Sequence, residues 1–251
     1  MLLDLVSFNV RCCDDKDGNS IDERAPRLEK LLLQISADVL TFQEIRPKWV
    51  PEIQRIFSKD YEIFLCYRSQ EKPEGLITLW KKERFDCLEK GFFWLSDTPE
   101  VESRGWDEKY DCPRICSYAL LKEKGSEQTF LAMNTHFGFG DTCQLKSVGL
   151  IKKYRDRFSD VKAFVAGDFN MLPQSPAHIE IQRNFVDANQ VTIRDRRATF
   201  HNYHPAPDQN FHIDYIFCDQ RIFTKTFKIL DGDVEGKYPS DHFGIYSQLF
   251  L

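Results

Sequence analysis

Apolar residues recur along the chain with two different periods, and the longer period predicts four helices. The expected helices span residues 24–36, 47–57, 142–158 and 175–182. In the third helix, the spacing places four side chains on the inward face: Leu145, Val148, Ile151 and Tyr154. Helices with one apolar face are expected to cover a larger core.

Short apolar runs bounded by polar or turn-forming residues predict the strands. The expected strands span residues 2–9, 39–44, 61–65, 75–80, 85–93, 115–121, 130–135, 164–166, 198–200, 213–218, 223–230 and 243–250. The first helix lies between two buried strands, which is the order of a βαβ-like unit. No repeat or linker-like stretch interrupts this pattern. We therefore predict an α/β fold in which residues 1–251 form a single domain of two mixed sheets and outer helices.

The composition and charge of the chain mainly indicate which classes of protein are not expected. The formal net charge is −5, so no global basic field draws the protein to an anionic membrane or to nucleic acid. A nucleic-acid partner is thus not indicated, although a local basic patch would permit one. No apolar run approaches the length of a membrane span, and residues 1–10 resemble a strand rather than a signal peptide. We expect a cytoplasmic monomer whose eight cysteines are reduced.

The stretch Val165-Ala166-Gly167-Asp168-Phe169-Asn170 holds the strongest candidate chemistry. Gly167 permits a tight backbone at the end of a buried strand. Asp168 and Asn170 are two residues apart and share a face of an extended chain, whereas Phe169 points to the other face. The pattern predicts a carboxylate and an amide at the end of a sheet, where α/β folds place chemistry. A plain turn is the alternative, since both residues form turns.

Other predicted strands also end in polar residues. These residues are Asn9, Gln43 with Glu44, Asn134 with His136, Asp214, and Asp241 with His242. Glu44 lies at the rim of the buried strand that begins with Val39 to Phe42, so it is either solvated or a ligand for a hard cation such as Mg²⁺. Asp214 enters a strongly apolar strand and needs a partner, because an unpaired buried charge is costly. His242 is the natural partner for Asp214, since a carboxylate that fixes a histidine tautomer is a recurring catalytic device.

Taken in order, these stretches resemble the motifs of the endonuclease/exonuclease/phosphatase superfamily. The motifs are Ser7-Phe8-Asn9, Gln43-Glu44, Asn134-Thr135-His136, Gly167-Asp168-Phe169-Asn170, Ile213-Asp214-Tyr215-Ile216 and Ser240-Asp241-His242. They run from the first strand to the last, so the resemblance covers nearly the whole chain. Three further segments resemble a bacterial branch of the superfamily: residues 93–99, 105–106 and 113–116. The resemblance implies a deoxyribonuclease I-like, four-layer α/β sandwich, with two packed mixed β-sheets flanked by helices.

The resemblance also implies a role for each polar strand end. Glu44 would bind a divalent metal, usually Mg²⁺ with Mn²⁺ as a substitute, and Asn9 and Asp241 would lie beside that metal. Asp168 would orient and deprotonate the attacking water, and Asn170 would hold Asp168 or the phosphate.

The remaining implied roles concern the phosphoryl group. His136, together with Asn134, would donate to a phosphoryl oxygen, and His242, oriented by Asp214, would stabilise the pentavalent transition state. These roles fit phosphate-ester hydrolysis, which needs in-line attack, charge neutralisation and a metal.

The polar segment 96–111 is expected to be a long surface loop, and loops of that length are often functional. Within it, Trp106 lies between Gly105 and Asp107 and is predicted to contact substrate. Arg114 either reaches the phosphate or pairs with an acid.

The predicted function is a metal-dependent phosphoesterase that hydrolyses a phosphodiester or a phosphomonoester. The alternative is a catalytically silent module that binds a phosphate ligand on the same fold.

Overall fold

The computed structural model describes residues 1–206 and 208–251. Within these residues, the first sheet has six strands in the order β11-β12-β1-β2-β4-β3. Their bounds are β1 Leu2–Asn9, β2 Val39–Ile45, β3 Tyr61–Tyr67, β4 Gly75–Lys81, β11 Phe223–Leu230 and β12 Gly244–Phe250. Strands β1 and β2 are parallel, and the other pairings are antiparallel. The sheet is therefore mixed, as its sequence pattern predicted.

The second sheet has six strands in the order β5-β6-β7-β8-β10-β9. Their bounds are β5 Phe85–Trp94, β6 Ile115–Glu123, β7 Thr129–His136, β8 Lys162–Asp168, β9 Phe185–Asp187 and β10 Asp214–Asp219. Strands β7 and β8 are parallel and are joined by a helix, so this sheet is mixed as well.

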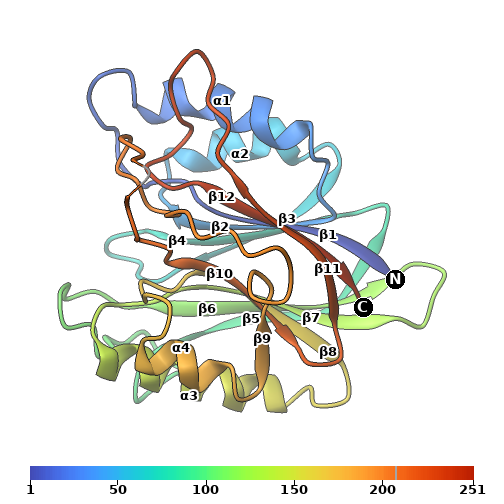
Figure 1. Cartoon of the computed structure of the whole chain (residues 1–251). Coiled ribbons are helices and arrows are strands. Elements are labelled where there is room, and N and C mark those ends of the chain that lie inside the picture. Colours follow the sequence, from blue (N-terminus) through green and yellow to red (C-terminus); the bar gives the residue numbers. More distant parts are fainter. Residues whose placement is uncertain (207) are drawn as a thin grey trace.

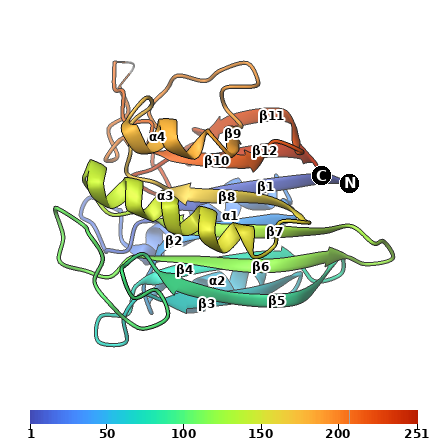
Figure 2. The same ribbon diagram turned by 90° about the horizontal axis from the view of Figure 1, so that it is seen from below.

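The two sheets pack face to face, and helices cover both outer faces (Figures 1 and 2). Helices α1 (Ile21–Leu33) and α2 (Trp49–Phe57) lie on the first sheet, and α3 (Asp141–Asp156) and α4 (Pro176–Ile181) lie on the second. One apolar cluster fills the space between the sheets, and two more lie between each sheet and its helices. This is the predicted four-layer α/β sandwich.

Local interactions move some helix boundaries away from the predicted ones. Helix α1 begins at Ile21 rather than at residue 24, because Ser20 and Glu23 form a capping box. In α3, Leu145 was expected to face inward but is 37% exposed. The side chain of Gln144 is buried instead and donates to the carbonyl oxygens of Gly138 and Asn170. Polar contacts, rather than apolar periodicity alone, therefore set the rotation of this helix.

Two strand predictions near the C-terminal half were incomplete. Residues 198–200 do not form a strand; only an isolated bridge joins Phe200 to His242. The short strand β9 was not predicted, because three residues carry too little alternation to detect. No helix in the described residues is long and apolar enough to cross a membrane.

Candidate active site

Asp168 ends strand β8, between two neighbouring strands of the second sheet. It is the register partner of His136 at the end of β7 and of Asp214 at the start of β10. Gly167 has a φ of 150°, and a Cβ atom there would lie 2.0 Å from the carbonyl oxygen of Thr135. Only glycine fits this close approach. The backbone therefore brings three polar side chains to one edge of the sheet.

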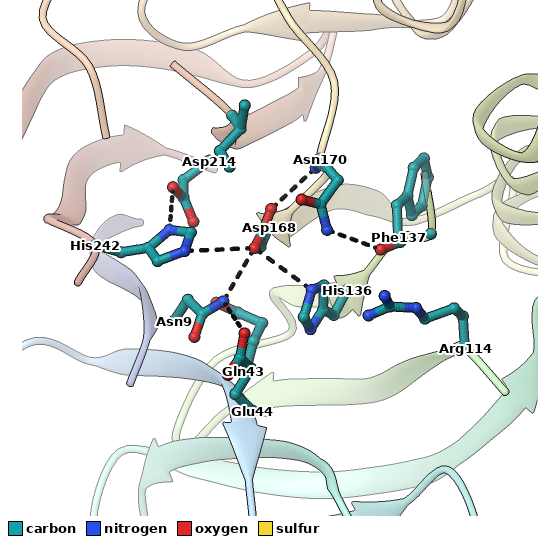
Figure 3. Close-up of polar contacts among 12 residues, drawn as sticks. Asn9, Gln43, Glu44, Arg114, His136, Phe137, Asp168, Asn170, Asp214 and His242 are labelled. Carbon is teal, nitrogen blue, oxygen red and sulfur yellow. Dashed lines mark hydrogen bonds and ion pairs between the residues drawn. The ribbon is translucent and has the colours of Figure 1, made fainter. Parts of the chain in front are cut away.

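The carboxylate of Asp168 is the centre of a polar network (Figure 3). Its Oδ2 accepts a hydrogen bond from Nδ2 of Asn9 at 3.0 Å and lies 3.5 Å from Nε2 of His136 and 3.8 Å from Nε2 of His242. Its Oδ1 accepts from the backbone N–H of Asn170 at 2.9 Å. Burial, reinforced by the nearby Asp214 carboxylate, raises the pKa of Asp168 to about 7. Asp168 can therefore exchange a proton near neutral pH.

Asp214 and His242 form the predicted acid–histidine pair. Nδ1 of His242 lies 2.9 Å from Oδ2 of Asp214, and both side chains are buried. Burial alone would lower the pKa of His242, but the carboxylates of Asp214, Asp168 and Asp241 raise it to about 10. The imidazole is thus a cation at neutral pH, and its Nε2 faces Asp168 (Figure 3).

Glu44 lies near the end of β2 on the first sheet, where the backbone turns. Its φ is 63°, and the pairing of β2 with β4 is irregular between Phe42 and Ile45. Oε2 accepts from the backbone N–H of Cys12 at 2.9 Å, and Oε1 accepts from Nδ2 of Asn9 at 3.1 Å. Burial opposes ionisation, but these two donors and the charge of His242 hold the pKa of Glu44 below its usual value. Glu44 is therefore an ionised carboxylate that lines the cavity described below.

The residues expected beside a metal take different positions. Asn9 donates Nδ2 to both carboxylates and accepts from the backbone N–H of Arg11 at 3.0 Å, so it bridges Glu44 and Asp168 instead of offering a free oxygen ligand. Asp241 lines the same cavity, 3.6 Å from the Nε of Arg11. Burial raises the pKa of Asp241.

The donor set at this edge fits a hard divalent cation. Glu44 and Asp241 supply carboxylate oxygens, which are the ligands that Mg²⁺ prefers. A second group, Asp168, Asp214 and His242, has ligand atoms within 4.8 Å of one another. In that group, Asp214 and His242 already bond to each other, and Oδ1 of Asp214 has no partner. The first group could therefore hold a divalent cation, and the second group could hold one or exchange protons.

His136 and Arg114 lie on the other side of Asp168. Burial and the neighbouring Arg114 guanidinium hold the pKa of His136 well below its usual value, so its ring is neutral. Arg114 lines the cavity and pairs with Asp107 at 3.0 Å, with both side chains almost fully buried. The two alternatives for Arg114 are thus not exclusive, because it pairs with an acid while it faces the cavity.

Two residues expected to contact substrate, Asn134 and Trp106, do not line the cavity, whereas Asn170 does. Asn134 is fully buried between the sheets, where it bonds to the side chain of Gln43 and to main-chain oxygens of the first sheet. Nδ2 of Asn170 donates to the carbonyl oxygen of Phe137, and only its backbone reaches Asp168. Trp106 donates to Asp97 outside the cavity, beneath the ammonium group of Lys146. The prediction that Asn134 and Trp106 contact the substrate is therefore wrong.

A cavity of about 790 Å³ opens above Asp168, Glu44 and His242. Sequence reasoning missed much of its lining: Arg11, Arg46, Arg68, Lys72, Lys109, Tyr110, Phe139, Phe200 and Phe211. These residues lie in irregular segments, where no period marks the direction of a side chain. The one available signal was the unusual length of the polar loop that carries Lys109 and Tyr110.

The model of the Endonuclease/Exonuclease/phosphatase family matches residues 134–242. Among solved structures, a mannosyl-6-phosphatase of Bacteroides thetaiotaomicron is 25% identical, with a TM-score of 0.89 over 99% of this chain and 100% of that one. An uncharacterized protein of Acanthamoeba polyphaga mimivirus is 28% identical over 59% of this chain and 59% of its own length. The Ccr4 exoribonuclease subunit of the Candida albicans CCR4-Not complex is 26% identical over 62% of this chain.

The match to Ccr4 spans 24% of that subunit, so this chain covers less than two thirds of either curated relative. The likeness to the solved structure extends over both sheets and all the strand ends that form the site. The family match begins at Asn134 and ends at His242, and it includes Asp168 and Asp214. The chain is therefore similar to the Endonuclease/Exonuclease/phosphatase family over residues 134–242, and it shares the fold of bacterial structures of that family over nearly its whole length.

Proposed function

We propose that the protein is a metal-dependent phosphoesterase. One observation carries the proposal: a buried carboxylate with a pKa near neutrality, Asp168, faces a cationic histidine, His242, across the floor of a cavity. One site thus holds both a base that can accept a proton from water and a cation that can stabilise the charge of the transition state. The ionised Glu44 lies on the same floor and would hold Mg²⁺, with Asp241 nearby. A silent binding module would not need this pairing of shifted pKa values.

Each side chain of the site has a separate role in the proposed hydrolysis. Asp168 accepts a proton from the attacking water through its free lone pairs, while Asn9 and the N–H of Asn170 fix its orientation. His242 keeps its proton because Asp214 holds Nδ1, and the Nε2 proton stabilises charge that builds on the phosphoryl oxygens. His136 is neutral and donates a hydrogen bond from one ring nitrogen. A bound Mg²⁺ would supply Lewis-acid stabilisation of the phosphoryl group.

We further propose that the substrate is a phosphomonoester on a compact, sugar-like group. The mannosyl-6-phosphatase aligns over its entire length, which supports this class. Four cationic residues of the cavity are already paired with carboxylates: Arg11, Arg46, Arg68 and Arg114. Within the described residues, Lys72 and Lys109 are the cavity cations without an ion pair, which leaves little charge to neutralise a run of phosphates, as a nucleic acid requires. A nuclease is the second candidate, favoured by the similarity to the exoribonuclease subunit.

A hydrolysis panel tests the proposal. The panel compares mannose 6-phosphate, glucose 6-phosphate, inositol phosphates, bis-p-nitrophenyl phosphate, single-stranded DNA and RNA, each with Mg²⁺, Mn²⁺ or EDTA. We expect turnover of the sugar monophosphates that needs a divalent cation. Preferential cleavage of RNA or DNA would favour the nuclease, and phosphate binding without turnover of any ester would favour the silent module. The monomeric state and cytoplasmic location stay predictions.

A further inference from the structure

Asp107 lies in the long loop between β5 and β6, and its carboxylate joins three segments beside the proposed site. Oδ2 accepts from Nε of Arg114 and lies beside Nη2 of the same guanidinium, both at 3.0 Å. Oδ1 accepts from the backbone N–H groups of Lys109 and Tyr110 at 3.0 Å and of Phe139 at 3.2 Å. Only 2% of the Asp107 side chain is exposed. One buried carboxylate thus satisfies a cation and three main-chain donors.

The chain leaves space for this arrangement next to β7. A Cβ atom on Gly138 would lie 2.8 Å from three atoms of the Asp107 side chain, and one on Gly140 would meet the carboxylate of Glu108. The backbone N–H of Glu108 donates to the carbonyl oxygen of Phe139 at 3.0 Å. The loop is therefore fixed against the segment that follows His136.

Two cavity features depend on this fixed loop. The first is Arg114, whose guanidinium is directed toward the ring of His136 (Figure 3). Asp107 takes Nε and Nη2, and Nη1 has no hydrogen-bond partner within the described residues. The second is an aromatic wall, in which the rings of Tyr110 and Phe139 lie 5.5 Å apart and the Nζ of Lys109 lies 4.4 Å from the Phe139 ring centroid.

We propose that Asp107 is a positioning residue, which aims Arg114 at the phosphate and fixes the aromatic wall that holds the leaving group. This inference rests on the proposed phosphoesterase function. An arginine whose Nε and Nη2 are held by a carboxylate keeps Nη1 free in one orientation, which suits recognition of a single phosphoryl oxygen. An aromatic wall next to that cation suits a ring-bearing phosphomonoester.

The test is a double-mutant cycle with Asp107→Asn and Arg114→Gln. The amide keeps an acceptor for the three main-chain donors but places an N–H group against the guanidinium. We expect each single variant to lower kcat/KM for mannose 6-phosphate roughly 10- to 100-fold, the scale for loss of an orienting group. The double variant should lose no more than Arg114→Gln alone. Asp97→Asn, which removes the acceptor of Trp106 in the same loop, is the matched control and should retain parental activity.

Binding of inorganic phosphate, measured by calorimetry with Mg²⁺, gives a readout that does not need turnover. Asp107→Asn, Arg114→Gln and the double variant should weaken phosphate binding equally, without a large fall in Tm. Additive losses in the double variant, or parental phosphate affinity in Asp107→Asn, would overturn the inference. A parent that binds phosphate but hydrolyses no ester would contradict the proposed function and leave the positioning role of Asp107 supported.

A third variant separates the two parts of the role. Asp107→Ala removes the acceptor for the main-chain donors as well as the partner of Arg114. We expect it to raise KM for mannose 6-phosphate further than Asp107→Asn does, while glycerol 3-phosphate, which has no ring, responds equally to both variants. If Asp107→Ala and Asp107→Asn had equal KM values for mannose 6-phosphate, the aromatic wall would have no part in holding the leaving group.

Discussion

Asp168 and Asp214 are register partners in the antiparallel pair of β8 and β10. Two carboxylates are thereby held on neighbouring strands, and the like charge adds to burial in raising the pKa of Asp168. His242 lies between them, with Nδ1 on Asp214 and Nε2 facing Asp168. The histidine stays charged, while Asp168 becomes a base of moderate strength. One register pairing thus shifts the pKa values of Asp168 and His242.

Replacement of Asp168 by Asn tests its role as the base. The amide keeps the shape of the side chain and can still accept from the N–H of Asn170. We expect turnover to fall ~10²-fold or more, the scale of general acid–base catalysis, with little change in substrate affinity. Single-turnover rates and Tm of both proteins provide the measurement. A variant that is less stable but fully active would show that Asp168 is only a turn residue.

The pH dependence of kcat should follow the same groups. Asp168 has to be deprotonated, and its pKa of about 7 predicts that activity rises with pH through that value. His242 has to be protonated, and its pKa of about 10 predicts that activity falls through that value. A pH–rate profile between pH 5 and 11 with saturating Mg²⁺ checks both limbs. An acidic limb near the ordinary aspartate value would exclude Asp168 as the titrating base.

Glu44→Gln tests the metal ligand. The amide preserves the size of the side chain but removes the negative charge that a hard cation needs. We expect weaker Mg²⁺ binding by calorimetry and a higher Mg²⁺ requirement for turnover, with an unchanged fold by circular dichroism. Glu62→Gln on β3, an exposed glutamate, is the control and should bind Mg²⁺ like the parent. Equal Mg²⁺ affinity in both variants would mean that Glu44 does not hold the metal.

Gly167→Ala tests the backbone at the strand end. A methyl group would meet the carbonyl oxygen of Thr135 at 2.0 Å in a φ region that disfavours side chains. We expect a loss of about 3 kcal/mol in the free energy of unfolding, the upper range for a strained backbone. Gly149→Ala in α3 is a matched control, because a methyl group there meets open space. That control should gain about 0.5–1 kcal/mol, and urea unfolding measures both.

The sequence was most informative where periodicity and burial act together. The apolar runs predicted eleven of the strands to within a few residues, and the buried Asp214 required a partner, which proved to be His242. The period-2 rule correctly placed Asn134 and His136 on one face of the strand. It did not predict how far each side chain lies from the open edge of the sheet. Asn134 lies two residues further from the strand end, roughly 7 Å deeper, and so lies between the sheets rather than in the cavity. Trp106 and Asp107 lie in a loop whose shape depends on contacts distant in the sequence.

The site draws its groups from both sheets. Asn9 and Glu44 come from the first sheet, Asp168 and Asp214 come from the second, and His242 lies two residues before β12 of the first. The bonds from Asn9 to Asp168 and from His242 to Asp214 therefore cross the interface between the layers. A folding intermediate with every strand formed but the layers apart would hold two inert half-sites. The candidate site is therefore complete only where the two layers are docked against each other.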